Sequence, residues 1–274
     1  MWLRYVSGSW QETLPLTRAE LFGDGVFETL HIYKGRILFA SDHLRRLHQA
    51  TLAIGLELPL RLESLFEQVE QVASSFLHAR AKVILYRAGE GTYLPPTPWA
   101  EISLKVSSLS LTSFPFNNPQ RLVKFPVPFL VDTPWSPYKT LSALGYVQAS
   151  AYAQLHRCDD AIILSKEGFL AETSRANVFF WDGKVLHTPA LRSGCIAGIL
   201  RHHILRIARS EGIHVEEGLY PFSLLCSAEE VFTTNVIQGI TPILGVHGEK
   251  QSFRTGNNTI AAFLARKLSE QLQV

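Results

Sequence analysis

Several features of secreted, membrane and metal-binding proteins are scarce or missing in this sequence. Its only cysteines, Cys158, Cys195 and Cys226, lie far apart and form no C-x-x-C pair, so neither a disulfide framework nor a zinc site is indicated. Apolar runs fall short of the roughly 20 residues that a membrane helix needs. The first residues alternate like a strand and lack the basic, apolar and cleavage segments of a signal peptide. We therefore expect a cytoplasmic protein that binds no metal and no membrane.

An excess of charge is also missing. The formal net charge is only +2, which provides no long-range attraction for nucleic acid, so we expect any bound anion to be held by local contacts. The sequence contains no G-x-G-x-x-G, no phosphate-loop G-K-S/T, no H-E-x-x-H and no G-x-S-x-G. Nucleotide-binding, zinc-protease and serine-hydrolase functions therefore lose their usual support.

What is present suits a mixed α/β (α+β) protein of two modest domains, since 274 residues exceed one compact core. Residues 114–120 hold two prolines and two asparagines between strand-like runs, which predicts a linker. We therefore expect an N-terminal domain over 1–113 and a C-terminal domain over 121–274. Periodicity and turn residues predict a hairpin over 27–40, helices near 41–55, 62–77, 141–156, 199–212 and 260–272, and strands near 82–87, 101–111, 161–164, 177–181 and 230–234.

Six short segments follow one another in an informative order. They are FGDGVFET at 22–29, HLRRL at 43–47, PYKT at 137–140, LAETSRANVF at 170–179, GCIAGILR at 194–201 and TTNVIQGITP at 233–242. This series resembles the class IV, fold-type IV pyridoxal-phosphate enzymes, which include branched-chain and D-amino acid aminotransferases and aminodeoxychorismate lyase. The resemblance spans nearly the whole chain. It implies a small N-terminal α/β domain, a larger pseudo-barrel domain that binds the cofactor, a small amino substrate and a homodimer.

The resemblance assigns the covalent cofactor anchor to Lys139 and the carboxylate facing the pyridine nitrogen to Glu172. A lysine serves as nucleophile and proton carrier only if a dry pocket and nearby cations lower its pKa. A carboxylate at Glu172 would keep the ring nitrogen protonated, so that the ring absorbs electrons. Taken singly, Lys139 would be a surface lysine and Glu172 a strand glutamate paired with Arg175; their places in the series favour the functional roles.

By resemblance, the cofactor phosphate is held by an arginine, a helix N-terminus and a turn. Arg46 supplies a bidentate contact, while its neighbour Arg45 faces elsewhere. The amides of Gly198, Ile199 and Leu200 open a helix and are expected to point at the phosphate, although Gly198 also suits a plain turn. Asn235 and Val236 close the site, and Val236 offers only its backbone N–H because it lacks a hydroxyl.

Three details favour the lyase over the aminotransferases. The Asn235 segment resembles the lyase version, Leu144 replaces a tyrosine typical of branched-chain enzymes, and Thr29 places a hydroxyl where it could protonate departing pyruvate. Thr29 is also compatible with an ordinary strand position. The lyase would convert aminodeoxychorismate to 4-aminobenzoate and pyruvate, whereas an aminotransferase would return the proton to the cofactor. A binding module that kept the fold without the cofactor is the third alternative.

Binding of the substrate carboxylates is the weakest part of the lyase hypothesis. Lyases often carry two arginines in a glycine-rich loop, whereas residues 86–93, YRAGEGTY, retain only Arg87, and Glu90 would repel a dianion. We expect Arg87, with Arg175 or His31 in support, to bind the substrate. Arg87 is equally consistent with an exposed charge at a strand end.

Overall fold

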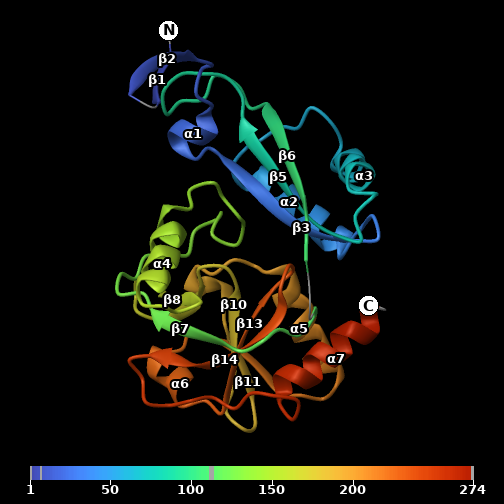
Figure 1. The fold of residues 1–274 in the computed structure, drawn as a ribbon, viewed down its shortest axis with the longest axis vertical. Coiled ribbons are helices and arrows are strands. Elements are labelled where there is room, and N and C mark those ends of the chain that lie inside the picture. Colours follow the sequence, from blue (N-terminus) through green and yellow to red (C-terminus); the bar gives the residue numbers. More distant parts are fainter. Residues whose placement is uncertain (1, 7, 111–113, 273–274) are drawn as a thin grey trace.

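The computed structural model describes residues 2–6, 8–110 and 114–272. Two sheets dominate the described chain, a four-stranded sheet in its first part and an eight-stranded sheet in its second (Figure 1). A small hairpin of β1 (Trp2–Val6) and β2 (Ser9–Thr13) precedes them and projects from the N-terminal end. Among the described residues, 109–110 and 114–119 belong to no strand of either sheet, and β7 begins at Gln120, the last residue of the predicted linker 114–120. The proposed end of the first domain, residue 113, lies outside the described residues.

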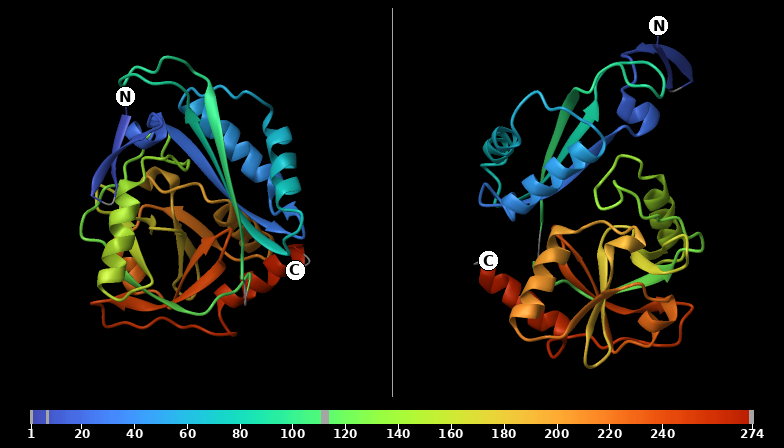
Figure 2. Two further views of the ribbon diagram at one scale, coloured as in Figure 1. Left: turned by 45° about the horizontal axis from the view of Figure 1, so that its top comes forward. Right: turned by 180° about the vertical axis from the view of Figure 1, so that it is seen from behind.

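The N-terminal sheet has the strand order β4-β3-β5-β6 and is covered by helices on one face only (Figure 2). The alternation along its strands explains this arrangement, because Val26, Leu30 and Ile32 are fully buried while Phe27 and Thr29 between them are half-buried. The buried set packs on the helices, and the opposite face stays open. The elements are α1 (Arg18–Phe22), β3 (Gly25–Tyr33), β4 (Arg36–Ile37), α2 (Ala40–Ala53), α3 (Leu62–Val72), β5 (His78–Arg87) and β6 (Ala100–Ser108).

The C-terminal sheet has the order β12-β11-β10-β13-β14-β7-β8-β9 and mixes parallel with antiparallel pairs. Its two faces carry separate apolar clusters, so its central strands are buried on both sides. The strands are β7 (Gln120–Lys124), β8 (Asp160–Leu164), β9 (Leu170–Thr173), β10 (Asn177–Trp181), β11 (Leu186–Pro189), β12 (Val215–Gly218), β13 (Glu230–Asn235) and β14 (Gly239–His247). The helices are α4 (Leu144–Leu155), η1 (Leu191–Ser193), α5 (Ile199–Ser210), α6 (Phe222–Cys226) and α7 (Ile260–Leu272).

Backbone hydrogen bonds join the two parts of the molecule next to Lys139. The amide of Phe27 donates to the carbonyl of Lys139 at 2.8 Å, and the amide of Leu141 donates to the carbonyl of Gly25 at 2.9 Å. The segment around Lys139 thus extends the free edge of β3 like a short added strand. A residue of the second part is therefore aligned by the sheet of the first.

Three predicted boundaries need correction. The helix predicted over 141–156 begins only at Leu144, because the preceding residues pair with β3. The helix predicted over 41–55 spans Ala40–Ala53 and follows Phe39, which has a left-handed backbone with φ 58°. The helix predicted over 62–77 ends at Val72. None of the described helices has the length and apolarity required to cross a bilayer.

Candidate active site

Lys139 lies between the two sheets, with its ammonium close to the open face of the N-terminal sheet. Its Nζ is 5.3 Å from the centroid of the Phe27 ring. Burial lowers the pKa of Lys139 below its ordinary value, and the nearby Arg46 guanidinium acts in the same direction, against Glu28 and Glu172. Within the described chain the ammonium forms no ion pair of 4 Å or less. The amine is therefore desolvated and available, as a nucleophile must be.

Glu172 is nearly inaccessible on β9 and is bound entirely by neutral groups. The Tyr146 hydroxyl donates to Oε1 at 2.7 Å, and the amide of Ile196 and Nδ2 of Asn177 donate to Oε2 at 3.2 and 3.3 Å. Burial raises the pKa of Glu172 to about 7, while Tyr146, Lys139 and the amide of Ile196 oppose the rise. The expected alternative, a pair with Arg175, does not occur. A carboxyl poised near neutrality can hold or release a proton at a ring nitrogen.

A buried ion pair links β3 to α2 beside Lys139. Both oxygens of Glu28 accept hydrogen bonds from Nε and Nη2 of Arg46 at 2.7 Å, and His43 Nδ1 lies 2.9 Å from Oε2. These partners lower the pKa of Glu28 to about 2, although burial alone would raise it. Arg46 also donates from Nη1 to the carbonyl of Ala197 at 2.9 Å. Three of its five N–H groups are thus used, and two remain for an anion.

The start of α5 and the end of β13 form the predicted phosphate site. The amide of Gly198 donates to the carbonyl of Ile196 at 2.9 Å, so it does not serve as the free donor that we expected. The amides of Ile199 and Leu200 are among the first of α5, which have no intrahelical acceptor. Gly198 also leaves room for Asn177, because a Cβ there would lie 2.0 Å from Oδ1 of that side chain.

A threonine that the sequence analysis did not single out completes this region. Thr234 is the cross-strand partner of Asn177, and its buried Oγ1 has no hydrogen-bond partner within the described part of the chain. The neighbouring Asn235 uses its side chain in its own turn, accepting from the amides of Ile237 and Gln238. Asn235 therefore shapes the turn, and Val236 retains its N–H. The unsatisfied Thr234 hydroxyl suits a phosphate oxygen.

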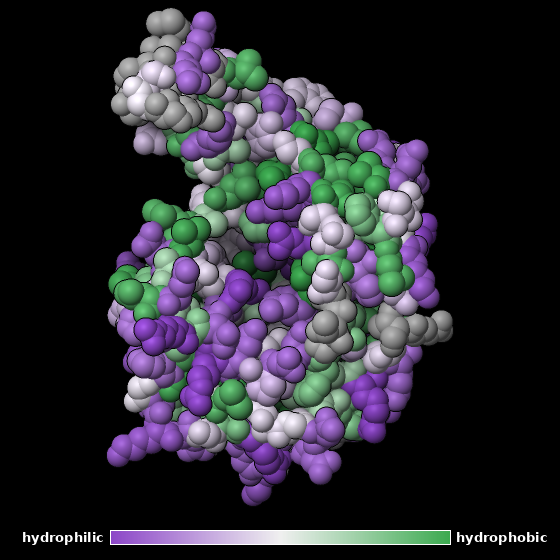
Figure 3. Space-filling model, viewed as in Figure 1, coloured by the Kyte–Doolittle hydropathy of each residue, from purple (hydrophilic) through white to green (hydrophobic). Residues whose placement is uncertain are grey.

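Thr29 lies two residues beyond Phe27 on the same face of β3 and is half-buried. Its cross-strand partner on β5 is Lys82. The molecule is hollowed between its N-terminal and C-terminal parts, with hydrophilic residues around the opening (Figure 3). The structure thus brings Thr29, Phe27 and Lys139 to one side of the N-terminal sheet.

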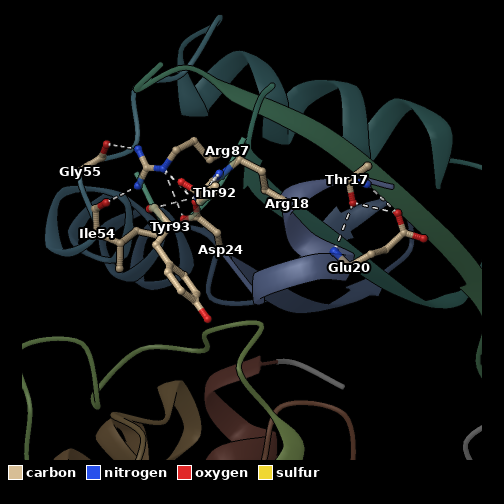
Figure 4. Close-up of polar contacts among 9 residues, drawn as sticks. All are labelled: Thr17, Arg18, Glu20, Asp24, Ile54, Gly55, Arg87, Thr92 and Tyr93. Atoms are coloured by element: carbon tan, nitrogen blue, oxygen red, sulfur yellow. Dashed lines mark hydrogen bonds and ion pairs between the residues drawn. The ribbon is translucent and has the colours of Figure 1, made fainter. Parts of the chain in front are cut away.

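Arg87 is buried, which corrects the alternative of an exposed charge at a strand end. Its Nε donates to Asp24 at 3.1 Å, and Nη1 and Nη2 donate to the carbonyls of Gly55 and Ile54 at 2.8 and 2.6 Å (Figure 4). Arg87 also lines a pocket of about 370 Å³ that reaches Thr140. Because Asp24, which also pairs with Arg18, and two backbone carbonyls engage its donors, Arg87 acts as a cross-link inside the protein.

The two other predicted substrate residues are also occupied by protein contacts. His31 is fully buried, with Nδ1 3.1 Å from the carbonyl of Val236 and Nε2 3.1 Å from Nδ1 of His78. Burial lowers the pKa of His31 to about 4, so the ring is neutral at pH 7. Arg175 is directed at the carbonyl of Asp159 and at Asp160, 3.6 Å away. The structure supports neither side chain as a substrate ligand.

Sequence reasoning missed Glu28, Tyr146, Asn177 and Thr234 as members of the site. Glu28, Asn177 and Thr234 lie inside the family-like segments quoted above, although the sequence did not indicate their roles. Tyr146 gave no such signal, because only the fold places α4 against β9. Leu144, counted above in favour of the lyase, is 72% exposed and does not enter the site.

This combination of fold and site defines a known class. The family model for amino-transferase class IV matches residues 25–246, and the chain belongs to this family. A putative branched-chain-amino-acid aminotransferase of Methanocaldococcus jannaschii is 26% identical over 92% of this chain and 87% of its own length. Aminodeoxychorismate lyase of Bacillus subtilis is 24% identical over 96% and 93%. The structure of a putative 4-amino-4-deoxychorismate lyase from Legionella pneumophila has a TM-score of 0.83, 24% identity and coverage of 95% and 96%.

These findings confirm the class IV family, the fold-type IV architecture and pyridoxal phosphate as the family's cofactor. The unsatisfied Thr234 hydroxyl and the desolvated Lys139 amine are the features that suit this cofactor. Lys139 would hold it covalently, and Glu172 would face its ring nitrogen. Its phosphate would meet Arg46, Thr234 and the first amides of α5. When bound, pyridoxal phosphate supplies an electron sink for the carbon beside the substrate's amino group.

Proposed function

We propose that this enzyme is a 4-amino-4-deoxychorismate lyase, which releases pyruvate and 4-aminobenzoate. The observation that carries the proposal is the position of Thr29, on the same face of β3 as the Phe27 ring and thus close to Lys139. A hydroxyl in this place can donate a proton to a departing enolpyruvyl group. Loss of that group makes the substrate ring aromatic, which drives the reaction forward.

The roles of the protein groups follow from their environment. Lys139, whose pKa is lowered by burial, takes the proton from the ring carbon that bears the substrate amine. Tyr146, Asn177 and Ile196 hold Glu172 in one orientation, in which its carboxylate would keep the ring nitrogen protonated. Thr29 supplies the proton at the leaving group. These steps require no amino acceptor, which separates a lyase from an aminotransferase.

An aminotransferase acting on branched-chain or D-amino acids is the second candidate, supported by the similarity to the Methanocaldococcus enzyme. Purified holoenzyme given aminodeoxychorismate without a keto acid should release pyruvate, measured with a coupled dehydrogenase. Amino transfer that depends on an added keto acid, with no pyruvate from aminodeoxychorismate, would reject the lyase. Thr29→Val should lower pyruvate release by about 10- to 100-fold, and Thr29→Ser should preserve most of it.

We also propose that the chain acts as a cytoplasmic homodimer. The support is a row of apolar side chains on the outward face of α4, where Leu144, Val147 and Leu155 are 72%, 58% and 77% exposed. Sedimentation equilibrium at micromolar concentration should give twice the chain mass of 30.7 kDa. A monomer that is fully active would reject the dimer.

A further inference from the structure

The open face of the N-terminal sheet carries three cations that have no carboxylate partner. Arg80 and Lys82 lie two residues apart on the same face of β5, and Lys105 is the cross-strand partner of Lys82 on β6. Within residues 8–110 and 114–272, none of the three forms an ion pair. Arg18 and Arg87 of the same domain, by contrast, share Asp24 as an ion-pair partner. Three cations without an ion-pair partner among the described residues therefore lie on the face beside Lys139.

Lys82 differs from the other two cations in its surroundings. It is half-buried, whereas Arg80 and Lys105 are exposed. Its Nζ lies 4.2 Å from the centroid of the Phe27 ring, the same ring that has Lys139 Nζ at 5.3 Å. The two ammonium groups thus flank one aromatic side chain, and burial lowers the pKa of Lys82 as well. Lys82 is also the cross-strand partner of Thr29.

A half-buried ammonium without a counterion carries a desolvation cost that a bound anion would offset. The contact with the Phe27 ring compensates only part of this cost. Arg87 and Arg175 are engaged by Asp24 and Asp160, and His31 is neutral. Among the described residues near Phe27 and Thr29, Lys82 thus has both proximity and an unused charge, and Lys139, the other such cation, is assigned to the cofactor.

We propose that Lys82 binds a carboxylate of the substrate and so makes the site selective for amino compounds that carry additional carboxylates. The inference rests on the proposed function, because it presumes that Lys139 marks the reacting carbon. Lys82 is a binding residue in this proposal and takes no part in proton transfer. Thr29, the cross-strand partner of Lys82, would then lie next to the departing enolpyruvyl group.

The test compares Lys82→Met with Lys105→Met, which removes the same charge from the adjacent strand at an exposed position. The probe is chorismate, which carries the two carboxylates of aminodeoxychorismate but has a hydroxyl in place of the amine. Calorimetric titration of each holoenzyme should show chorismate binding that is about 10- to 100-fold weaker in Lys82→Met and within twofold of wild type in Lys105→Met. Lys82→Arg should recover most of the affinity, and thermal melting checks that each variant is folded.

The outcomes separate the two proposals. Wild-type protein that releases no pyruvate, yet binds chorismate in a Lys82-dependent manner, would reject the lyase and keep the carboxylate site. Active protein whose chorismate affinity falls equally in Lys82→Met and Lys105→Met would reject the site and keep the lyase. Failure of the wild-type holoenzyme to bind chorismate would also overturn the site. If Lys82→Met does not fold, Lys82→Gln removes the same charge and provides the same comparison.

Discussion

The hydroxyl of Tyr146 lies 2.7 Å from Oε1 of Glu172 and joins α4 to β9 at the center of the candidate site. Burial raises the pKa of Tyr146 far above its ordinary value, so the phenol stays protonated and donates the hydrogen bond. Glu172 is thereby oriented by a neutral donor that does not cancel its charge. This arrangement preserves the carboxylate for the ring nitrogen of the cofactor.

Removing this phenol should weaken cofactor binding. Tyr146→Phe deletes one of the three hydrogen bonds to Glu172, and a hydrogen bond to a charged group contributes about 1.5–3 kcal/mol. We expect cofactor affinity to fall by roughly 10-fold or more, measured by absorbance during equilibrium dialysis. The matched control is Tyr152→Phe on the same helix, whose ring packs on Phe125. Equal affinities in both variants would contradict the role of Tyr146.

The titration of Glu172 predicts how the stability of the apoprotein changes with pH. Its pKa is about 7 in the folded state and near 4.5 when unfolded, so between these values the folded state binds more protons. Stability should therefore fall as pH rises from 4.5 to 7, by roughly 3 kcal/mol at most from this group. Urea unfolding of the apoprotein at several pH values measures the slope. Glu172→Gln should reduce the dependence of the free energy of unfolding on pH. An unchanged slope would mean that another group titrates in this range.

The Glu28–Arg46 pair should support both the fold and the cofactor. Arg46→Ala leaves the carboxylate of Glu28 buried without its main partner, which costs about 3–5 kcal/mol of stability. It also removes the two N–H groups that remain for the phosphate, so cofactor retention should fall. Arg45→Ala is the control, because Arg45 is exposed on the same helix. Unchanged cofactor affinity in a folded Arg46→Ala protein would contradict the phosphate assignment.

Gly198 should be intolerant of any side chain. A Cβ at this position would lie 2.0 Å from Oδ1 of Asn177, which in turn contacts Glu172 and the carbonyl of Ile196. Gly198→Ala should therefore displace Asn177 and lower cofactor affinity by roughly 10-fold. Gly212→Ala is a control for a loss of stability away from the site, since nothing lies within 4 Å of its Cβ position but its left-handed backbone (φ 75°) strains any side chain. Similar cofactor affinity in the two variants would count against this geometry.

Lys139→Ala should abolish turnover while the protein stays folded. The ammonium has no ion pair among the described residues and is desolvated, so its removal relieves a cost and breaks no bond of the side chain. We expect activity to fall at least about 10³-fold. Borohydride treatment followed by peptide mass spectrometry should label Lys139 in wild type only. Lys166→Ala, at an exposed position, should be indistinguishable from wild type.

The ordered segments made the family, the cofactor and the position of Lys139 predictable, because the residue types and their spacing survive in the sequence. The substrate contacts were harder to predict from the sequence. Arg87 and His31 have the right chemistry for anion binding, yet burial and fixed partners remove them from that role. The position of Lys82 beside the site was not predictable from the sequence. It depends on the register between β3 and β5, which makes Lys82 the cross-strand partner of Thr29.

The hydrogen bonds between Lys139 and β3 have a consequence for how the chain can be divided. A fragment that begins at residue 121 would retain Glu172, the start of α5 and Thr234, but the segment that carries Lys139 would lose its hydrogen bonds to β3. The N-terminal and C-terminal parts of the chain therefore depend on each other for the position of Lys139. A chimeric enzyme that combines one part of this chain with the other part of a relative must therefore preserve the hydrogen bonds between β3 and the lysine segment.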